Sequence, residues 1–155
     1  MKNELTQINL VLAWLWILLG FVSGMILGLF FRGENWLGGY ASFKRRMYRL
    51  GHISFFGLGA VNLLFCLTVK NFALTGEAIH LASLAFAVGA IAMPLCCVVM
   101  AHCPKAHMIF SIPVVSLLLG GALLLLVIMQ MPKVPATAGS KAVASNYQPS
   151  TLNSP

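Results

Sequence analysis

Charged residues are scarce in this sequence, and their scarcity excludes most kinds of soluble protein. Asp, Glu, Lys and Arg together make up 8% of the 155 residues, whereas hydrophobic residues make up 59%. A typical soluble domain is about 25% charged. Only three residues are acidic, and none of them falls within the long apolar stretches. A proton relay of the usual intramembrane Asp/Glu kind therefore has no obvious carrier, and no soluble catalytic motif is present.

Long uncharged stretches take up most of the sequence. Four segments contain no Asp, Glu, Lys or Arg: residues 8–31, 50–69, 80–100 and 107–129. Each is long enough to cross a hydrocarbon core of about 30 Å at about 1.5 Å per residue. The mean hydropathy of +0.90 agrees with this. The sequence predicts an all-α, polytopic membrane protein, with one four-helix transmembrane bundle over residues 1–131. A disordered polar tail is expected over residues 132–155.

The basic residues cluster just before the second span, at Lys44, Arg45, Arg46 and Arg49. Such a cluster retains its loop on the cytoplasmic side of the membrane, and contact with lipid headgroups is a natural second role. We therefore expect both termini to lie outside, in a bacterial cytoplasmic membrane. The net charge of +7 then reflects topology, and nucleic acid is not an expected partner.

Small and polar residues within the spans predict how the helices pack. Gly20, Gly24 and Gly28 recur every four residues in the first span and form a stripe that a neighbouring helix can approach closely. Asn62 falls near mid-membrane, where an amide must find a partner. Trp14 and Trp16 are expected near the headgroup boundary. The aromatic and glycine residues of the first loop predict an ordered segment in the interface.

Two histidines, His52 and His107, stand near or at the start of the second and fourth spans. Both lie at the same face of the membrane in either orientation, and alternate helices of a bundle can be diagonal neighbours. Neutral imidazole is a good axial ligand for haem iron, and helix bundles build cofactor sites from facing helices. The pair therefore raises the hypothesis of a haem b site. The competing hypothesis is that both histidines merely sit at headgroup level.

A second hypothesis is a metal site at the same face. His102 and Cys103 join the third span to the fourth, so His52, His102, Cys103 and His107 offer three imidazoles and a thiol. Such a set suits tetrahedral zinc or copper, although the spacing matches no strong metal signature. The plan of four spans with histidines on alternate helices is similar to four-helix haem b membrane proteins and to the four-helix halves of haem A synthases. This resemblance covers helix number and histidine placement, and it carries over no motif.

The sequence favours a small, non-catalytic protein of the inner membrane. The glycine stripe and the alanine-rich third span predict packing against other membrane subunits, or self-association, in addition to contact with the lipid bilayer. We therefore expect a subunit or an assembly factor of a larger membrane complex. The alternative function is haem-based electron transfer or haem handling through His52 and His107.

Overall fold

The computed structural model describes residues 4–131, and throughout that range the regular structure is helical, with no strand. The elements are α1 (Glu4–Phe30), the short 3-10 helix η1 (Trp36–Gly38), α2 (Phe43–Asn71), α3 (Glu77–His102), the 3-10 segment η2 (Pro104–Phe110) and α4 (Ser111–Met129). Four helical segments are long and apolar enough to cross a membrane: Gln7–Phe30, Phe43–Asn71, Glu77–His102 and Pro104–Met129. The predicted all-α four-helix bundle is confirmed. The predicted tail, residues 132–155, lies outside the described range.

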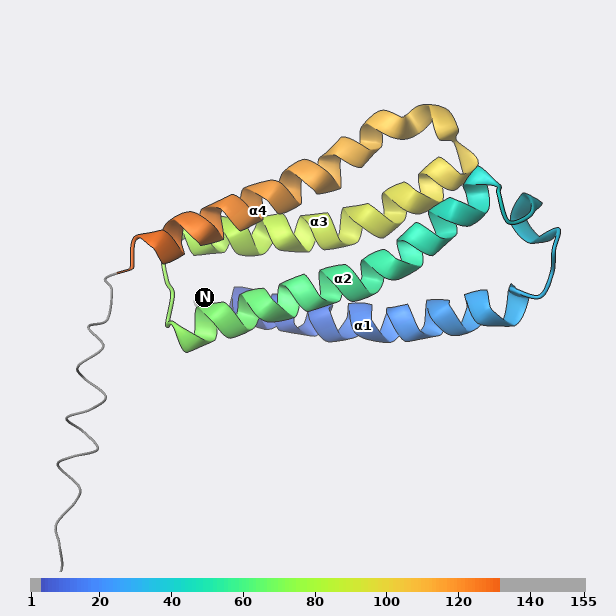
Figure 1. Cartoon of the computed structure of the whole chain (residues 1–155). Helices are drawn as coiled ribbons and strands as arrows, with labels where there is room; N and C mark the ends of the chain where they lie inside the picture. Colours follow the sequence, from blue (N-terminus) through green and yellow to red (C-terminus); the bar gives the residue numbers. More distant parts are fainter. Residues whose placement is uncertain (1–3, 132–155) are drawn as a thin grey trace, which may run out of the picture.

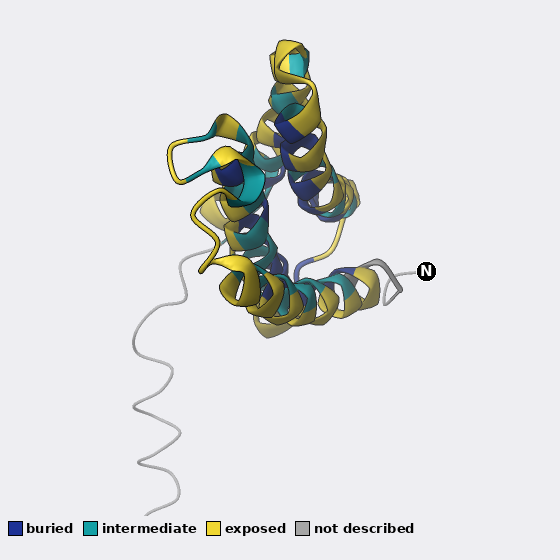
Figure 2. Ribbon diagram, turned by 90° about the vertical axis from the view of Figure 1, so that its right-hand side faces the viewer, coloured by how far each residue is buried: buried dark blue, intermediate teal, exposed yellow. Residues whose placement is uncertain are grey.

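The helices lie side by side in chain order, with α2 and α3 in the middle and α1 and α4 at the two edges (Figure 1). α2 packs along both α1 and α3, and α4 packs along α3. α1 also touches α3, whereas within residues 4–131 neither α1 with α4 nor α2 with α4 is a main packing pair. Side chains of α4 such as Leu123 still reach the buried cluster that includes Phe65 of α2. Buried residues line the inner sides of the helices, while the outer faces are exposed (Figure 2). The bundle is therefore open between its first and last helices.

α2 begins earlier than the uncharged stretch that predicted it. It starts at Phe43 rather than near Leu50, so the basic cluster lies in its first two turns. Ser42 caps the helix, because its hydroxyl oxygen accepts a hydrogen bond from the backbone N–H of Arg45 at 3.2 Å. Lys and Arg are good helix formers, so the charges limit the length of the apolar segment but do not limit the helix.

The fourth span also begins differently from the prediction. Residues Pro104–Phe110 form η2, and the α-helix starts only at Ser111. Pro104 opens η2 at a position where its missing N–H costs nothing. His107 therefore lies on this tighter segment instead of heading an α-helix, which changes the direction in which its side chain leaves the backbone.

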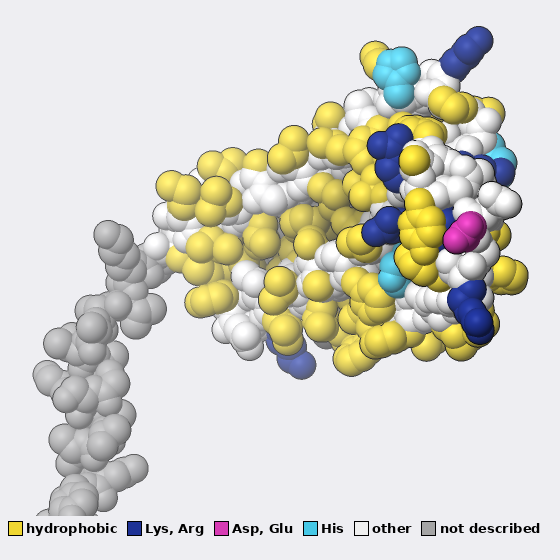
Figure 3. Space-filling model, turned by 45° about the vertical axis from the view of Figure 1, so that its right-hand side comes forward, with side chains coloured by type: hydrophobic (Ala, Val, Ile, Leu, Met, Phe, Trp, Pro, Cys, Tyr) yellow, Lys and Arg dark blue, Asp and Glu magenta, His cyan; other side chains and the backbone are white. Residues whose placement is uncertain are grey.

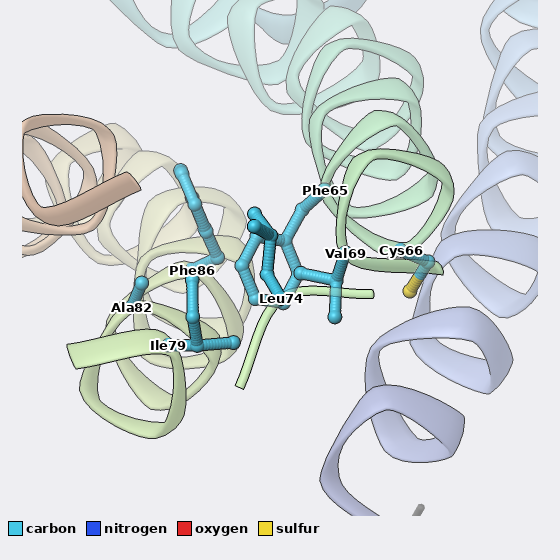
Figure 4. Packing of buried hydrophobic residues seen from close by; sticks show 7 residues of the cluster. All are labelled: Phe65, Cys66, Val69, Leu74, Ile79, Ala82 and Phe86. Carbon is cyan, nitrogen blue, oxygen red and sulfur yellow. The ribbon is translucent and has the colours of Figure 1, made fainter. Parts of the chain in front are cut away.

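The main cluster of buried hydrophobic residues closes the turn between α2 and α3. Phe65 from α2 and Phe86 from α3 have ring centroids 5.2 Å apart. Around them lie Cys66, Val69, Leu74, Ile79 and Ala82, all buried (Figure 4). Lipid is as apolar as these side chains, so close van der Waals packing rather than exclusion of water joins the two helices. This cluster fixes the end of the bundle opposite to the basic residues.

Candidate functional site

Three polar side chains meet in the core where α1, α2 and α3 converge. Asn9 and Asn62 are both 0% exposed, and Ser83 is 3% exposed. The Asn9 amide nitrogen donates to the Asn62 side-chain oxygen at 2.8 Å and to the Ser83 carbonyl at 3.1 Å. In return, the Ser83 hydroxyl donates to the Asn9 side-chain oxygen. We call Asn9, Asn62 and Ser83 the polar triad. The partner that Asn62 requires in mid-membrane is therefore Asn9, which the sequence did not identify.

A second polar contact crosses the bundle from α1 to α3. Pro94 lies inside α3 and has no N–H, so the carbonyl of Ala90 four residues earlier lacks its usual helical donor. The indole N–H of Trp16 donates to that carbonyl at 2.9 Å. Trp14 is exposed, but Trp16 turns inward. The Trp16 indole thus finds its acceptor within the bundle, on a carbonyl that a proline of another helix leaves without its helical donor. The placement of Trp14 and Trp16 near the headgroup boundary stays a prediction.

His52 faces α1 across the α1–α2 interface. Its Nδ1 lies 3.0 Å from the hydroxyl oxygen of Ser23, and that hydroxyl lies 3.0 Å from the carbonyl of Gly20. A Cβ atom at Gly24 would come within 2.8 Å of the imidazole Cε1. The imidazole thus occupies the space left by the missing side chain of Gly24. Ser23 and Gly24 together hold the ring in one orientation.

A cavity of about 260 Å³ adjoins His52 at the basic end of the bundle. Its walls come from α1, α2 and α3 and include Tyr48, His52, Phe55 and Pro94. Figure 3 shows that most of the visible Lys and Arg side chains gather at one end of the molecule. Hydrophobic side chains cover most of the remaining visible surface of the helices. A larger cavity of about 580 Å³ lies at the opposite end, where Lys70 and other residues around the α2–α3 turn line it. Of these two cavities, the smaller one is lined by an imidazole that a hydrogen bond orients.

Arg45 is enclosed by the loop between α1 and α2. It is 1% exposed, and its guanidinium carbon lies 4.8 Å from the ring centre of Phe31, 5.6 Å from that of Trp36 and 3.9 Å from that of Tyr40. One guanidinium nitrogen, Nη2, donates to the Phe31 carbonyl at 3.3 Å. Nε and Nη1 are buried and have no partner among the described residues. We call Arg45 with these three rings the arginine cage.

The arginine cage changes the interpretation of the basic cluster. The sequence grouped Arg45 with residues expected to contact lipid headgroups, but its guanidinium is enclosed by protein. Arg46 and Arg49 are exposed and Lys44 is half-buried, so these three remain available to headgroups. The sequence signal was the aromatic content of the loop, which predicted an ordered segment without indicating what that segment encloses.

The glycine stripe divides into two parts. A Cβ at Gly20 would lie 2.9 Å from the Phe56 ring, and Gly24 abuts His52, so both glycines pack against α2. No described atom outside the local backbone lies within 4 Å of a Cβ at Gly28. The stripe thus begins as an internal interface and continues onto an open surface.

The structure does not bring His52 and His107 together. His52 points to α1, whereas His107 is exposed on η2. α4 is held along α3 by contacts such as the Ser116 hydroxyl donating to the Ala85 carbonyl at 2.7 Å. α4 therefore packs mainly along α3 and not along α2. Gly59 leaves no room for a porphyrin, since its Cβ position lies 3.0 Å from the Ala13 carbonyl oxygen.

The four residues proposed for a metal site are also dispersed. Within residues 4–131, no three His, Cys, Asp or Glu side chains lie together in a way that would hold a metal ion. The His102 Nδ1 lies 3.1 Å from the carbonyl of Val98 in its own helix, and Cys103 is exposed. Adjacency along the chain therefore did not translate into a shared coordination site with His52 and His107.

Comparison with models of known protein families, with curated proteins and with solved structures finds no match for this chain. A functional interpretation must therefore come from the geometry of the four helices.

Proposed function

We propose that this membrane protein is a non-catalytic subunit or assembly factor of a larger complex in a bacterial cytoplasmic membrane. The first support is the use of its polar groups. Within the spans, the side chains of the polar triad and Trp16 bond to one another or to backbone carbonyls of neighbouring helices. Such bonds hold helices together, and they leave these groups committed to the fold instead of to a substrate.

The observation that carries the proposal is the open position at Gly28. Gly20 and Gly24 accept the rings of Phe56 and His52 from α2 in the space where a side chain would stand, and Gly28 continues the stripe with no described neighbour. A small residue gains packing energy when a second backbone approaches it, whereas lipid tails fill such a notch less well. The edge positions of α1 and α4 leave room for this approach.

The test compares three glycine-to-leucine variants in mild-detergent extracts after crosslinking in the native membrane. Gly28→Leu should reduce recovery of crosslinked complexes at least severalfold while leaving thermal stability unchanged, because no residue of the described range packs against that position. Gly57→Leu is the matched control, since Gly57 also has no described neighbour within 4 Å but lies on α2 outside the stripe. We expect recovery with Gly57→Leu to equal that of the original chain.

Gly24→Leu provides the internal comparison. Its side chain would collide with His52, and overpacking of this kind costs about 1–3 kcal/mol, so we expect lower thermal stability. The mass of the crosslinked species distinguishes a second copy of this chain from a different subunit. Recovery that is unaffected by Gly28→Leu would contradict the proposal.

A further inference from the structure

We infer that the cavity beside His52 binds the hydroxylated aromatic ring of a lipid-soluble phenol, with a hydroquinone head as the model ligand. This inference goes beyond the proposed subunit role and does not depend on it. Three features carry it: the hydrogen-bond geometry of the Ser23–His52 pair, the size and lining of the cavity, and the exposure of part of that lining on the outer surface of the bundle.

The hydrogen-bond pattern leaves one imidazole nitrogen available to a ligand. The Ser23 hydroxyl has a single proton, and the Gly20 carbonyl beside it can only accept. Both contacts of that hydroxyl become hydrogen bonds when Ser23 donates to Gly20 and the Nδ1–H of His52 donates to Ser23. In the neutral ring, Nε2 then carries a lone pair. Nε2 makes no hydrogen bond to any described residue, and His52 is one of the residues that line the cavity. Nε2 is therefore the ring nitrogen that remains to accept a hydrogen bond from a ligand there.

The cavity has the size and lining for a single ring. At about 260 Å³ it is slightly smaller than pockets that hold whole drug-sized molecules, about 300–1,000 Å³. Tyr48 and Phe55 contribute aromatic walls, and Pro94 closes the side toward α3. Aromatic rings favour edge-to-face or offset contacts with such walls. A ring that carries a hydroxyl therefore satisfies both the apolar lining and the lone pair of Nε2.

Part of the cavity lining reaches the outer surface of the bundle and forms the rim of the cavity. Ile26 of α1 and Val98 of α3 line the cavity and are 46% and 47% exposed. A hydrocarbon tail attached to the ring can leave between these two apolar side chains and continue among lipid tails. The basic residues at this end of the bundle place the cavity near one membrane surface, where amphiphilic rings are enriched.

The test uses tetramethylhydroquinone as the probe, titrated under argon into the full chain in phosphatidylcholine nanodiscs, with empty nanodiscs subtracted. The matched ligand is its dimethyl ether, which keeps the ring and methyl groups but has no proton to donate. We expect the ether and the corresponding quinone to bind about three to ten times more weakly than the hydroquinone, because each lacks the proton for one hydrogen bond. Equal binding of all three compounds would overturn the inference.

Two variants locate the binding. His52→Phe removes the acceptor and should weaken hydroquinone binding to the level of the ether. Val98→Phe narrows the rim without touching the Ser23–His52 pair and should weaken all three compounds. His80→Phe, at the opposite end of the bundle, is the control and should leave affinity unchanged. Because His52→Phe also removes the bond to Ser23, its thermal stability is measured in parallel. If that variant does not fold, the comparison with the ether and the Val98→Phe variant still test the inference. Unchanged binding of the hydroquinone to Val98→Phe would exclude the cavity as the binding site.

Discussion

In the core, on the side away from the basic residues, the polar triad is almost completely satisfied. Each of its three side chains bonds to another helix or to its own, and all three are buried. At the basic end, Arg45 keeps two buried nitrogens without described partners, and His52 keeps a ring nitrogen free beside a cavity. Buried polar groups that satisfy one another stabilise a fold. Groups left unpaired cost stability, so their presence at the basic end indicates where ligand or lipid contacts are to be sought.

The two connecting segments also differ in the kind of contact that holds them. Between α2 and α3 the turn is short, and the cluster around Phe65 and Phe86 covers it. Between α1 and α2 the loop is longer and folds over one arginine, with Leu37, Gly38 and Gly39 at positive φ. The first connection is held mainly by apolar packing, and the second by cation–π contacts and a helix cap. The predictions below break or sharpen this contrast.

Membrane topology gives the largest expected effect, because its readout is all-or-none. The basic cluster should lie in the cytoplasm and both termini outside. A periplasmic phosphatase reporter fused after Lys141 should be active, and the same reporter fused after Arg45 should be inactive. A cytoplasmic fluorescent reporter at the two positions should give the reverse pattern. Activity of the phosphatase after Arg45 alone would invert the orientation and place the His52 cavity at the outer surface.

Among substitutions that remove a hydrogen bond, the loss of the centre of the polar triad should be the most destabilising. Asn9→Leu deletes the donor to Asn62 and Ser83 and leaves their buried groups unpaired, so we expect a loss of about 2 kcal/mol. Unfolding in mixed micelles of increasing denaturing detergent measures it. Thr68→Val is the control, since that exposed hydroxyl bonds only to the Leu64 carbonyl of its own helix. Equal losses in both variants would show that the triad has no special role.

Much of the fold could be predicted from the sequence because a bilayer imposes a length and a composition on each span. The four uncharged stretches identify the four helices for that reason. Helix ends were less predictable. The cap at Ser42 and the 3-10 segment η2 depend on local hydrogen bonds, and hydropathy contains no information on these.

Contacts between helices could not be read in the same way. Helical periodicity placed His52 on an inward face but did not specify which neighbour it meets, and the imidazole meets α1 rather than α4. Asn62 was recognised as needing a partner, yet Asn9 near the start of α1 was not distinguished from the surrounding apolar residues. Arg45 was assigned by its charge, whereas its contacts depend on a loop fold that brings Phe31 and Tyr40 over it.

The Trp16–Ala90 contact should have a moderate effect that depends on Pro94. Trp16→Phe removes the indole N–H but keeps an aromatic ring, so we expect a loss of about 1 kcal/mol. Pro94→Ala restores a helical donor to the Ala90 carbonyl, and in that background Trp16→Phe should cost clearly less. A double-mutant cycle on unfolding free energies measures this coupling. Additive losses would mean that Trp16 contributes through packing against Phe55 and not through its hydrogen bond.

The arginine cage should give the smallest change in stability, because its contributions oppose one another. Arg45→Met loses three cation–π contacts and the bond to the Phe31 carbonyl, but it also removes the two buried nitrogens that lack partners. Replacing a buried charge by an apolar side chain of similar length is often close to neutral, so we expect a change below about 1 kcal/mol. Arg45→Lys should be worse than Arg45→Met, since a compact ammonium keeps the charge but loses the planar stacking. If Arg45→Met instead destabilises the protein as much as Asn9→Leu does, the buried guanidinium has a partner such as a lipid phosphate, and the contrast between the two ends must be revised.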